Sequence, residues 1–181
     1  MSKFYTKITS RLAKFINQQK IFFVATAPNS GRINLSPKGM DSFRVLSENR
    51  VIWLNVTGSG NETAAHLLEN KRITIMFCSF EKAPNILRLY GTGKEIKEGD
   101  ESWNELIELF PETPGTRQIF DICIDSAQTS CGMSIPYFEY KGEREDLNDW
   151  AAKEGKVGIK KYWEEKNQSS IDGLPTKILN D

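Results

Sequence analysis

Short runs of alternating apolar and polar residues cover most of the first 131 positions, and this period of two is typical of β-strands. Segment 117–128 is the clearest case, because Phe120, Ile122 and Ile124 alternate there with polar or small residues. Turn-forming stretches such as PNSG and polar runs such as ENR separate the segments. The sequence predicts strands over residues 21–27, 32–39, 43–47, 50–56, 72–80, 86–96 and 117–128.

Other segments show the helical period of 3.6 instead. Asn61 stands where the N-cap of a helix is expected, directly before the helical run ETAAHLLEN. The charged segment near the C-terminus is only weakly helical, and Gly155 and Gly158 argue against one unbroken helix there. The segments expected to be helical are 4–16, 62–70, 100–110 and 143–166.

This order of elements predicts a mainly β protein with peripheral helices. Strands of six to nine residues joined by short turns favour an antiparallel sheet curled into a barrel. The regular βαβ alternation of a doubly wound parallel sheet is missing. A chain of 181 residues suits one domain over 1–181, with the barrel at about 20–131 and a helical and polar C-terminal extension at about 132–181.

Composition narrows the possible classes of function. The 24 Lys and Arg residues balance the 24 Asp and Glu residues, which argues against general electrostatic binding of nucleic acid. Three cysteines without a CxxC arrangement and one histidine make a poor metal set, so no metal site is expected. Neither a secretory signal nor a run of transmembrane length is seen, so we expect a cytoplasmic protein with reduced cysteines and no membrane partner.

The stretch TGSGNETAAHL, which begins at Thr57, is the first candidate for chemistry. Its glycines, Gly60 included, allow a ligand to approach the backbone closely, and the helix that follows offers unpaired N–H groups. Hydroxyl groups on Thr57, Ser59 and Thr63 add donors, so the stretch suits a phosphate. The alternative from the residues alone is a flexible turn with an asparagine cap, since short glycine motifs are common.

Two basic residues are candidates to neutralise a bound anion. Lys38 follows a predicted strand in SPKG, and Arg88 lies between two leucines in ILRLYG. If Arg88 faces the barrel interior it needs an anion, because a desolvated charge without a partner is costly. The alternative is that Arg88 lies on a solvent-exposed face. For His66, within the predicted helix, a packing or surface role is expected and no catalytic triad can be assembled around it.

Three blocks of sequence in order carry a resemblance to a known family. They are FFVATAPNSGRINLSPKG, RVIWLNVTGSGNETAAHLLENKRITIMFCSF and ILRLYGTG, which together cover about residues 20–98. The chain resembles the FMN-binding split-barrel proteins related to pyridoxamine 5'-phosphate oxidase. The resemblance implies a six-stranded antiparallel split barrel and a homodimer with FMN at the interface.

The resemblance also implies a set of cofactor-binding residues. The phosphate cluster of better-known members, Ser-Arg-Lys, is replaced here by Asn61, Glu62 and Thr63, so other donors must compensate for two lost cations. C-terminal segments 128–131 and 170–175 are expected to reach the partner's flavin. The complete expected set for FMN is Ser36, Pro37, Lys38, Asn55, Thr57, Ser59, Gly60, Asn61, Glu62, Thr63 and Arg88.

The function implied by the resemblance is that of an FMN-dependent oxidoreductase acting on an unassigned small molecule. The C-terminal substrate-binding pattern of pyridoxamine 5'-phosphate oxidase, a tryptophan followed by an Arg-x-His motif, is not found. An alternative is a non-catalytic carrier or sensor of flavin, heme or deazaflavin. A dimeric barrel without any ligand is the third possibility.

Overall fold

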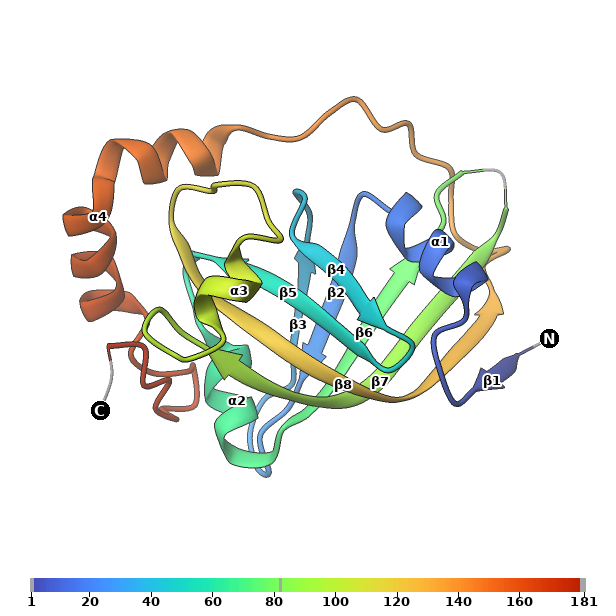
Figure 1. Ribbon diagram of the computed structural model, residues 1–181, viewed down its shortest axis with the longest axis horizontal. Helices are drawn as coiled ribbons and strands as arrows, with labels where there is room; N and C mark the ends of the chain where they lie inside the picture. Colours follow the sequence, from blue (N-terminus) through green and yellow to red (C-terminus); the bar gives the residue numbers. More distant parts are fainter. Residues whose placement is uncertain (1, 82, 180–181) are drawn as a thin grey trace.

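Antiparallel β-structure forms the body of the computed structural model, which describes residues 2–81 and 83–179 (Figure 1). The described strands are β1 (Lys3–Tyr5), β2 (Phe22–Thr26), β3 (Asn34–Lys38), β4 (Phe43–Ser47), β5 (Arg50–Val56), β6 (Arg72–Cys78), β7 (Asn85–Ile96) and β8 (Thr116–Cys131). The described helices are α1 (Ser10–Gln18), α2 (Glu62–Asn70), α3 (Trp103–Ile107) and α4 (Asp146–Lys166).

The seven longer strands form one antiparallel sheet in the order β3-β2-β6-β7-β8-β5-β4, and β1 pairs with β8. Within the described residues no pairing joins β3 to β4, so the sheet curls into a barrel that is split between them. The mainly β split-barrel class is therefore confirmed. All seven strands expected from the sequence pattern are present, whereas the six strands implied by the resemblance fall short of the eight observed, β1 included.

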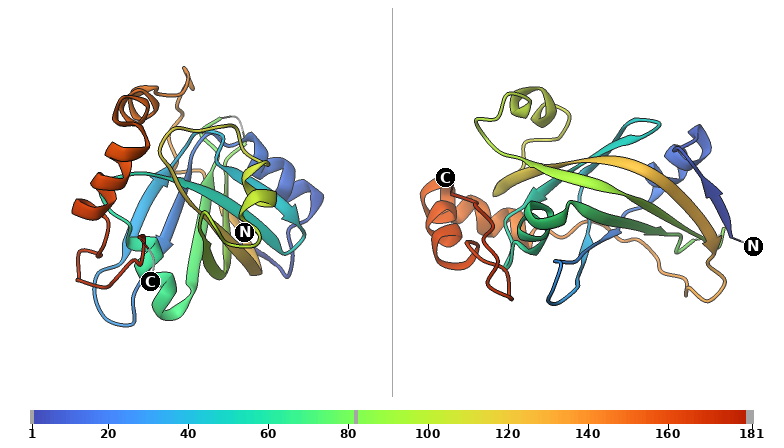
Figure 2. Two further views of the ribbon diagram at one scale, coloured as in Figure 1. Left: turned by 60° about the vertical axis from the view of Figure 1, so that its left-hand side comes forward. Right: turned by 90° about the horizontal axis from the view of Figure 1, so that it is seen from below.

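Both faces of β5 are buried, and so is the first part of β8 up to Phe120, which explains the continuous apolar run of β5. On the inner face Trp53 stacks on Phe120 with ring centroids 4.9 Å apart, and α1 and α2 add Leu12 and Leu67 to the same core. The outer face carries a second core of Ile52, Leu54, Ile96, Leu106, Phe110 and Ile119, which the segment around α3 covers (Figure 2). Two cores on opposite faces hold β5 and β8 rigidly, and the candidate site lies at their ends.

The N-terminal segment does not form the single helix expected over residues 4–16. Phe4 lies in β1 and is 68% exposed, and α1 begins only at Ser10, where the Thr9 hydroxyl accepts a hydrogen bond from the Leu12 amide at 3.4 Å. Pairing of β1 with β8 takes residues 3–5 away from the helix. The helix expected over residues 4–16 is therefore correct only from Ser10 onward.

The C-terminal extension returns along the whole barrel before it reaches the site. From the end of β8 the irregular segment 132–145 runs past the barrel to α4 at its other end (Figure 1). Gly155, with a φ of 61°, interrupts α4, as the glycines in this segment predicted. None of the helices in the described ranges is long and apolar enough to cross a membrane.

Candidate functional site

The loop over residues 57–63, hereafter the 57–63 loop, starts where β5 ends and is fixed at its base. Both the amide and the hydroxyl of Thr57 donate to the Gly115 carbonyl, each at 2.8 Å, and the Trp163 indole N–H donates to the Thr57 hydroxyl at 2.8 Å. Thr57, Asn61 and Thr63 are buried, whereas Ser59 is exposed. The loop is therefore a structured element and not the flexible turn that was the alternative reading.

Asn61 occupies the N-cap position of α2, but its side chain does not cap the helix. Its Oδ1 accepts a hydrogen bond from Gln118 Nε2 at 2.7 Å, and Asn61 Nδ2 is buried with no partner among the described residues. Ala65 is the first residue of α2 whose amide reaches a backbone carbonyl, that of Asn61 at 3.4 Å. The start of α2 thus keeps donors that the protein itself does not use, as an anion site requires.

The inward face of β3 points toward the same loop. Asn34, Ser36 and Lys38 pair with the buried face of β2, and Asn34 Nδ2 donates to the Thr63 hydroxyl at 3.4 Å. Lys38 Nζ lies 5.0 Å from the centroid of the Trp53 ring. Pro37 lies on the opposite face and is exposed, so the structure brings Ser36 and Lys38 to the loop but not the Pro37 side chain.

Two cations lie near one another beside the loop, Arg117 buried and Lys38 half-buried. Burial, and secondarily the nearby positive charge of Arg117, lowers the pKa of Lys38 to about 8. Burial likewise lowers the pKa of Arg117 to about 10, although Glu95 opposes this shift. No ion pair within 4.0 Å neutralises either cation in the part of the chain that the structure describes. Positive charge at the site is therefore opposed only at longer range, by the Glu95 carboxylate acting on Arg117.

Arg117 is the central residue that the sequence analysis missed. It is 5% exposed, and its Nη1 donates to the Gly60 carbonyl at 3.1 Å and to Asn167 Oδ1 at 2.7 Å. Together with Gln118 it forms a buried polar pair near the start of β8, directly before the buried Ile119 and Phe120. This pair was the available signal, because consecutive buried polar residues in a central strand need partners.

The chain's own C-terminal segment covers one side of the 57–63 loop. Asn167 Nδ2 donates to the Gly58 carbonyl at 3.0 Å, and the Ile171 amide donates to the Glu62 carboxylate at 3.0 Å. Segment 170–175 packs against the loop of its own protomer through the Ile171 amide, and its expected reach to a partner's flavin stays a prediction. The C-terminal segment therefore occupies the side of the loop that carries the Gly58 carbonyl and the Glu62 carboxylate.

Arg88 does not join this cluster within one protomer. Its neighbours Leu87 and Leu89 point into the core, so Arg88 faces outward, where its Nη1 donates to the Ser130 hydroxyl at 3.1 Å. Arg88 pairs with Gln128, whereas Val56 at the base of the loop pairs with Thr116, twelve residues away along β8. The alternative of an outward-facing arginine is therefore the correct one.

His66 has the packing role that was expected. It is 1% exposed, and its Nδ1 lies 3.0 Å from the Thr26 hydroxyl, so it joins α2 to β2. No group of three or more metal-ligating side chains occurs among the described residues.

Comparisons with known proteins identify the family of this chain. The family described as Pyridoxamine 5'-phosphate oxidase matches residues 8–131. The pyridoxamine 5'-phosphate oxidase family protein ustO of Aspergillus flavus is 34% identical over 97% of this chain and 78% of its own length. The chain belongs to the pyridoxamine 5'-phosphate oxidase family. The match of the family covers the barrel and ends at the last residue of β8, so the C-terminal extension lies outside it.

Solved structures share the fold of this chain. HupZ of Group A Streptococcus is 24% identical, with a TM-score of 0.52 over 65% of this chain and 89% of its own. A candidate pyridoxamine 5'-phosphate oxidase from Lactobacillus delbrueckii is 17% identical, with a TM-score of 0.55 over 68% of this chain and 94% of its own. These identities show a shared split-barrel fold and nothing further.

Proposed function

We propose that this member of the family binds FMN with the phosphate at the 57–63 loop and acts as an FMN-dependent oxidoreductase on a small molecule. The observation that carries the proposal is the buried Asn61 Nδ2, which has no partner among the described residues at the start of α2, together with Lys38, which has no ion pair there. Family membership favours a flavin as the ligand that these donors serve.

The residues present fit a phosphate group despite the lost cations of the Ser-Arg-Lys cluster. Lys38 and the backbone amides of the loop replace part of that charge, and Asn61 Nδ2 adds a buried donor. The Glu62 carboxylate accepts a hydrogen bond from the Ile171 amide on the side of the C-terminal segment. These features compensate for an acid at a position where the better-known oxidases have a base.

When bound, the flavin supplies the electron chemistry, so the protein needs no nucleophile of its own. The chain contributes position, polarity and exclusion of water. Lys38 places a positive charge beside Trp53 at the end of β3, where it favours an anionic form of a bound ring. The buried network of Gln118 and Asn61 fixes the loop against movement during turnover.

A homodimer with FMN at its interface is part of the proposal. One row of side chains crosses the outward face of four neighbouring strands. It consists of Pro37 on β3, Phe23 on β2, Met76 on β6 and Arg88 on β7. Leu35 on the same face is 64% exposed. An exposed sheet face of this kind favours association with a second copy. Sedimentation of the flavin-loaded protein should give a dimer, and a stable flavin-loaded monomer would exclude an interface site.

The visible absorption spectrum of the purified protein tests flavin binding directly. A yellow protein that NAD(P)H bleaches under anaerobic conditions supports the oxidoreductase. A bound flavin that no nicotinamide donor reduces supports the carrier or sensor instead. A colourless protein that leaves the fluorescence of added FMN unchanged contradicts both and leaves a ligand-free dimer.

Arg88→Ala tests the interface, because no described contact joins Arg88 to the 57–63 loop of its own protomer. If Arg88 meets the flavin across the dimer, loss of a charge-assisted contact should weaken FMN binding by about 1–3 kcal/mol. Titration of the variant with FMN measures this, with Arg72→Ala at an exposed position on neighbouring β6 as the control. Equal affinities for the wild type and Arg88→Ala remove Arg88 from the site.

A further inference from the structure

A cavity of about 770 Å³ lies on the other side of the 57–63 loop, between α4, the segment around α3 and the start of β8. None of residues 57–63 lines it, and its walls include parts of the C-terminal extension that the family match does not cover. A volume of this size suits a small organic ligand. The cavity is partly open to solvent and is distinct from the β3 side, where the flavin is proposed to bind.

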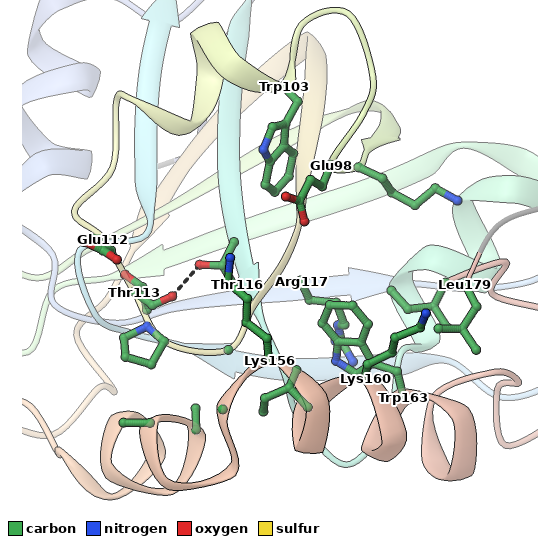
Figure 3. Close-up of a pocket in the computed structure, with 18 residues that line it drawn as sticks. Glu98, Trp103, Glu112, Thr113, Thr116, Arg117, Lys156, Lys160, Trp163 and Leu179 are labelled. Carbon is green, nitrogen blue, oxygen red and sulfur yellow. Dashed lines mark hydrogen bonds between the residues drawn. The ribbon is translucent and has the colours of Figure 1, made fainter.

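The walls of the cavity combine flat apolar surface with positive charge (Figure 3). Trp103 reaches in from α3, and Trp163 approaches from α4 on the opposite side. Four basic side chains line the cavity against the two acidic ones, Glu98 and Glu112. Lys156 and Lys160 of α4 are two of these basic residues. Aromatic walls with a surplus of cations match a flat molecule that carries a negative group.

Arg117 gives the cavity a specific anion-binding group. Its Nη1 is engaged by Gly60 and Asn167, whereas its Nε is buried with no partner among the described residues. The edge formed by Nε and Nη2 is the edge that binds two oxygens of a carboxylate or sulfonate side by side. A buried guanidinium with this edge unused is costly unless a ligand or water satisfies it.

We propose that this cavity binds a flat organic anion, an aromatic carboxylate or sulfonate, at a site separate from the flavin, with Arg117 as the anion-binding group. Trp103 and Trp163 contact the aromatic part of the ligand, and the lysines of α4 attract it electrostatically. Trp163 also bonds Thr57 at the base of the 57–63 loop. A ligand that contacts Trp163 in the cavity therefore touches a residue that holds the base of the 57–63 loop.

Titration calorimetry with anilinonaphthalene sulfonate as the probe tests the proposal on the full chain, with and without FMN. One saturable site per protomer is expected in both states. Neutral phenylnaphthylamine, which lacks the sulfonate, should bind at least about tenfold more weakly, as expected for a lost charge-assisted bond. Equal binding of the two probes overturns the proposal, because Arg117 then makes no contribution to recognition of the anionic group.

Matched variants locate the site. The double variant Lys156→Gln/Lys160→Gln should weaken sulfonate binding about fivefold, as two partly exposed cations predict, whereas Lys153→Gln/Lys161→Gln on the same helix should not. Ala152→Trp fills the cavity from its rim and should abolish binding, whereas Val157→Trp, outside the lining, should not. Cavity variants that behave like their controls refute the assignment.

Competition separates this site from the proposed flavin site. If FMN displaces the probe, the cavity belongs to the flavin and the separate site is refuted. If the protein binds no flavin but still binds the probe with the expected pattern of variants, the proposed function fails and the present inference stands.

Discussion

Replacement of Lys38 by methionine is expected to stabilise the ligand-free protein at pH 7 by about 1–2 kcal/mol. The figure is smaller than the full pKa shift would give, because the half-buried amine is partly screened by solvent. The folded pKa of about 8 lies below the ordinary value of 10.5, so the unfolded chain binds more protons between these pH values. The stability of the wild type should therefore rise with pH through this window, and the gain of the variant should disappear above it. Urea denaturation at pH 7 and above pH 10 measures both effects.

The same replacement is expected to weaken FMN binding at least about tenfold, because a charge-assisted contact with the ligand is lost. Lys14→Met, at an exposed position on α1, is the control for loss of a lysine elsewhere. Unchanged flavin affinity in Lys38→Met would exclude Lys38 from the site, and lower stability at pH 7 would mean that an unseen partner neutralises it.

Removal of the Asn167 side chain is expected to destabilise the protein by about 2–4 kcal/mol, because it leaves buried polar groups without partners. Asn167 is fully buried, accepts from Arg117, donates to Gly58, and its carbonyl accepts from the Thr176 hydroxyl at 2.6 Å. Asn167→Ala should therefore loosen the C-terminal segment from the 57–63 loop. Chemical denaturation gives the stability, and faster protease cleavage after residue 167 reports the loosening.

The exposed neighbour Gln168 supplies the control for this variant, since its side chain bonds only the Glu164 carbonyl within its own helix end. Gln168→Ala should change the free energy of unfolding by no more than about 0.5 kcal/mol, as is usual for surface substitutions. If Asn167→Ala is equally mild, the C-terminal segment does not support the loop.

The destabilising features of this protein are concentrated at one end of the barrel. Lys38 and Arg117 are desolvated without an ion pair, and Asn61 and Gln118 keep buried polar atoms without partners among the described residues. A protein selected for stability alone would not retain such groups, whereas a ligand that neutralises and bonds them accounts for their presence. The pattern supports an anion-binding end of the barrel independently of the family comparison.

Much of the architecture could be predicted from the sequence. Alternating patterns and short apolar runs bounded by turn signals located all seven long strands, because both are local properties of the sequence. Gly155 interrupted α4 as expected, for an equally local reason. The helix over 4–16 was wrong in its first part because β1 pairs with β8, more than a hundred residues away, and no local pattern encodes that pairing.

For the candidate site, the sequence determined the chemistry of the residues, and the tertiary structure determined which of them lie together. The sequence determined which residues have the chemistry to bind a phosphate, since hydroxyls, glycines and a helix start are recognisable in the 57–63 loop itself. Only the tertiary structure decided that Arg88 on β7 faces outward, beside the far end of β8. It also decided that Arg117 and Gln118 lie beside the loop, and that Asn167 bonds the loop through the Gly58 carbonyl. These relations depend on strand register and on the path of the C-terminal extension, which are set by burial of apolar faces across the whole chain and not by any one segment.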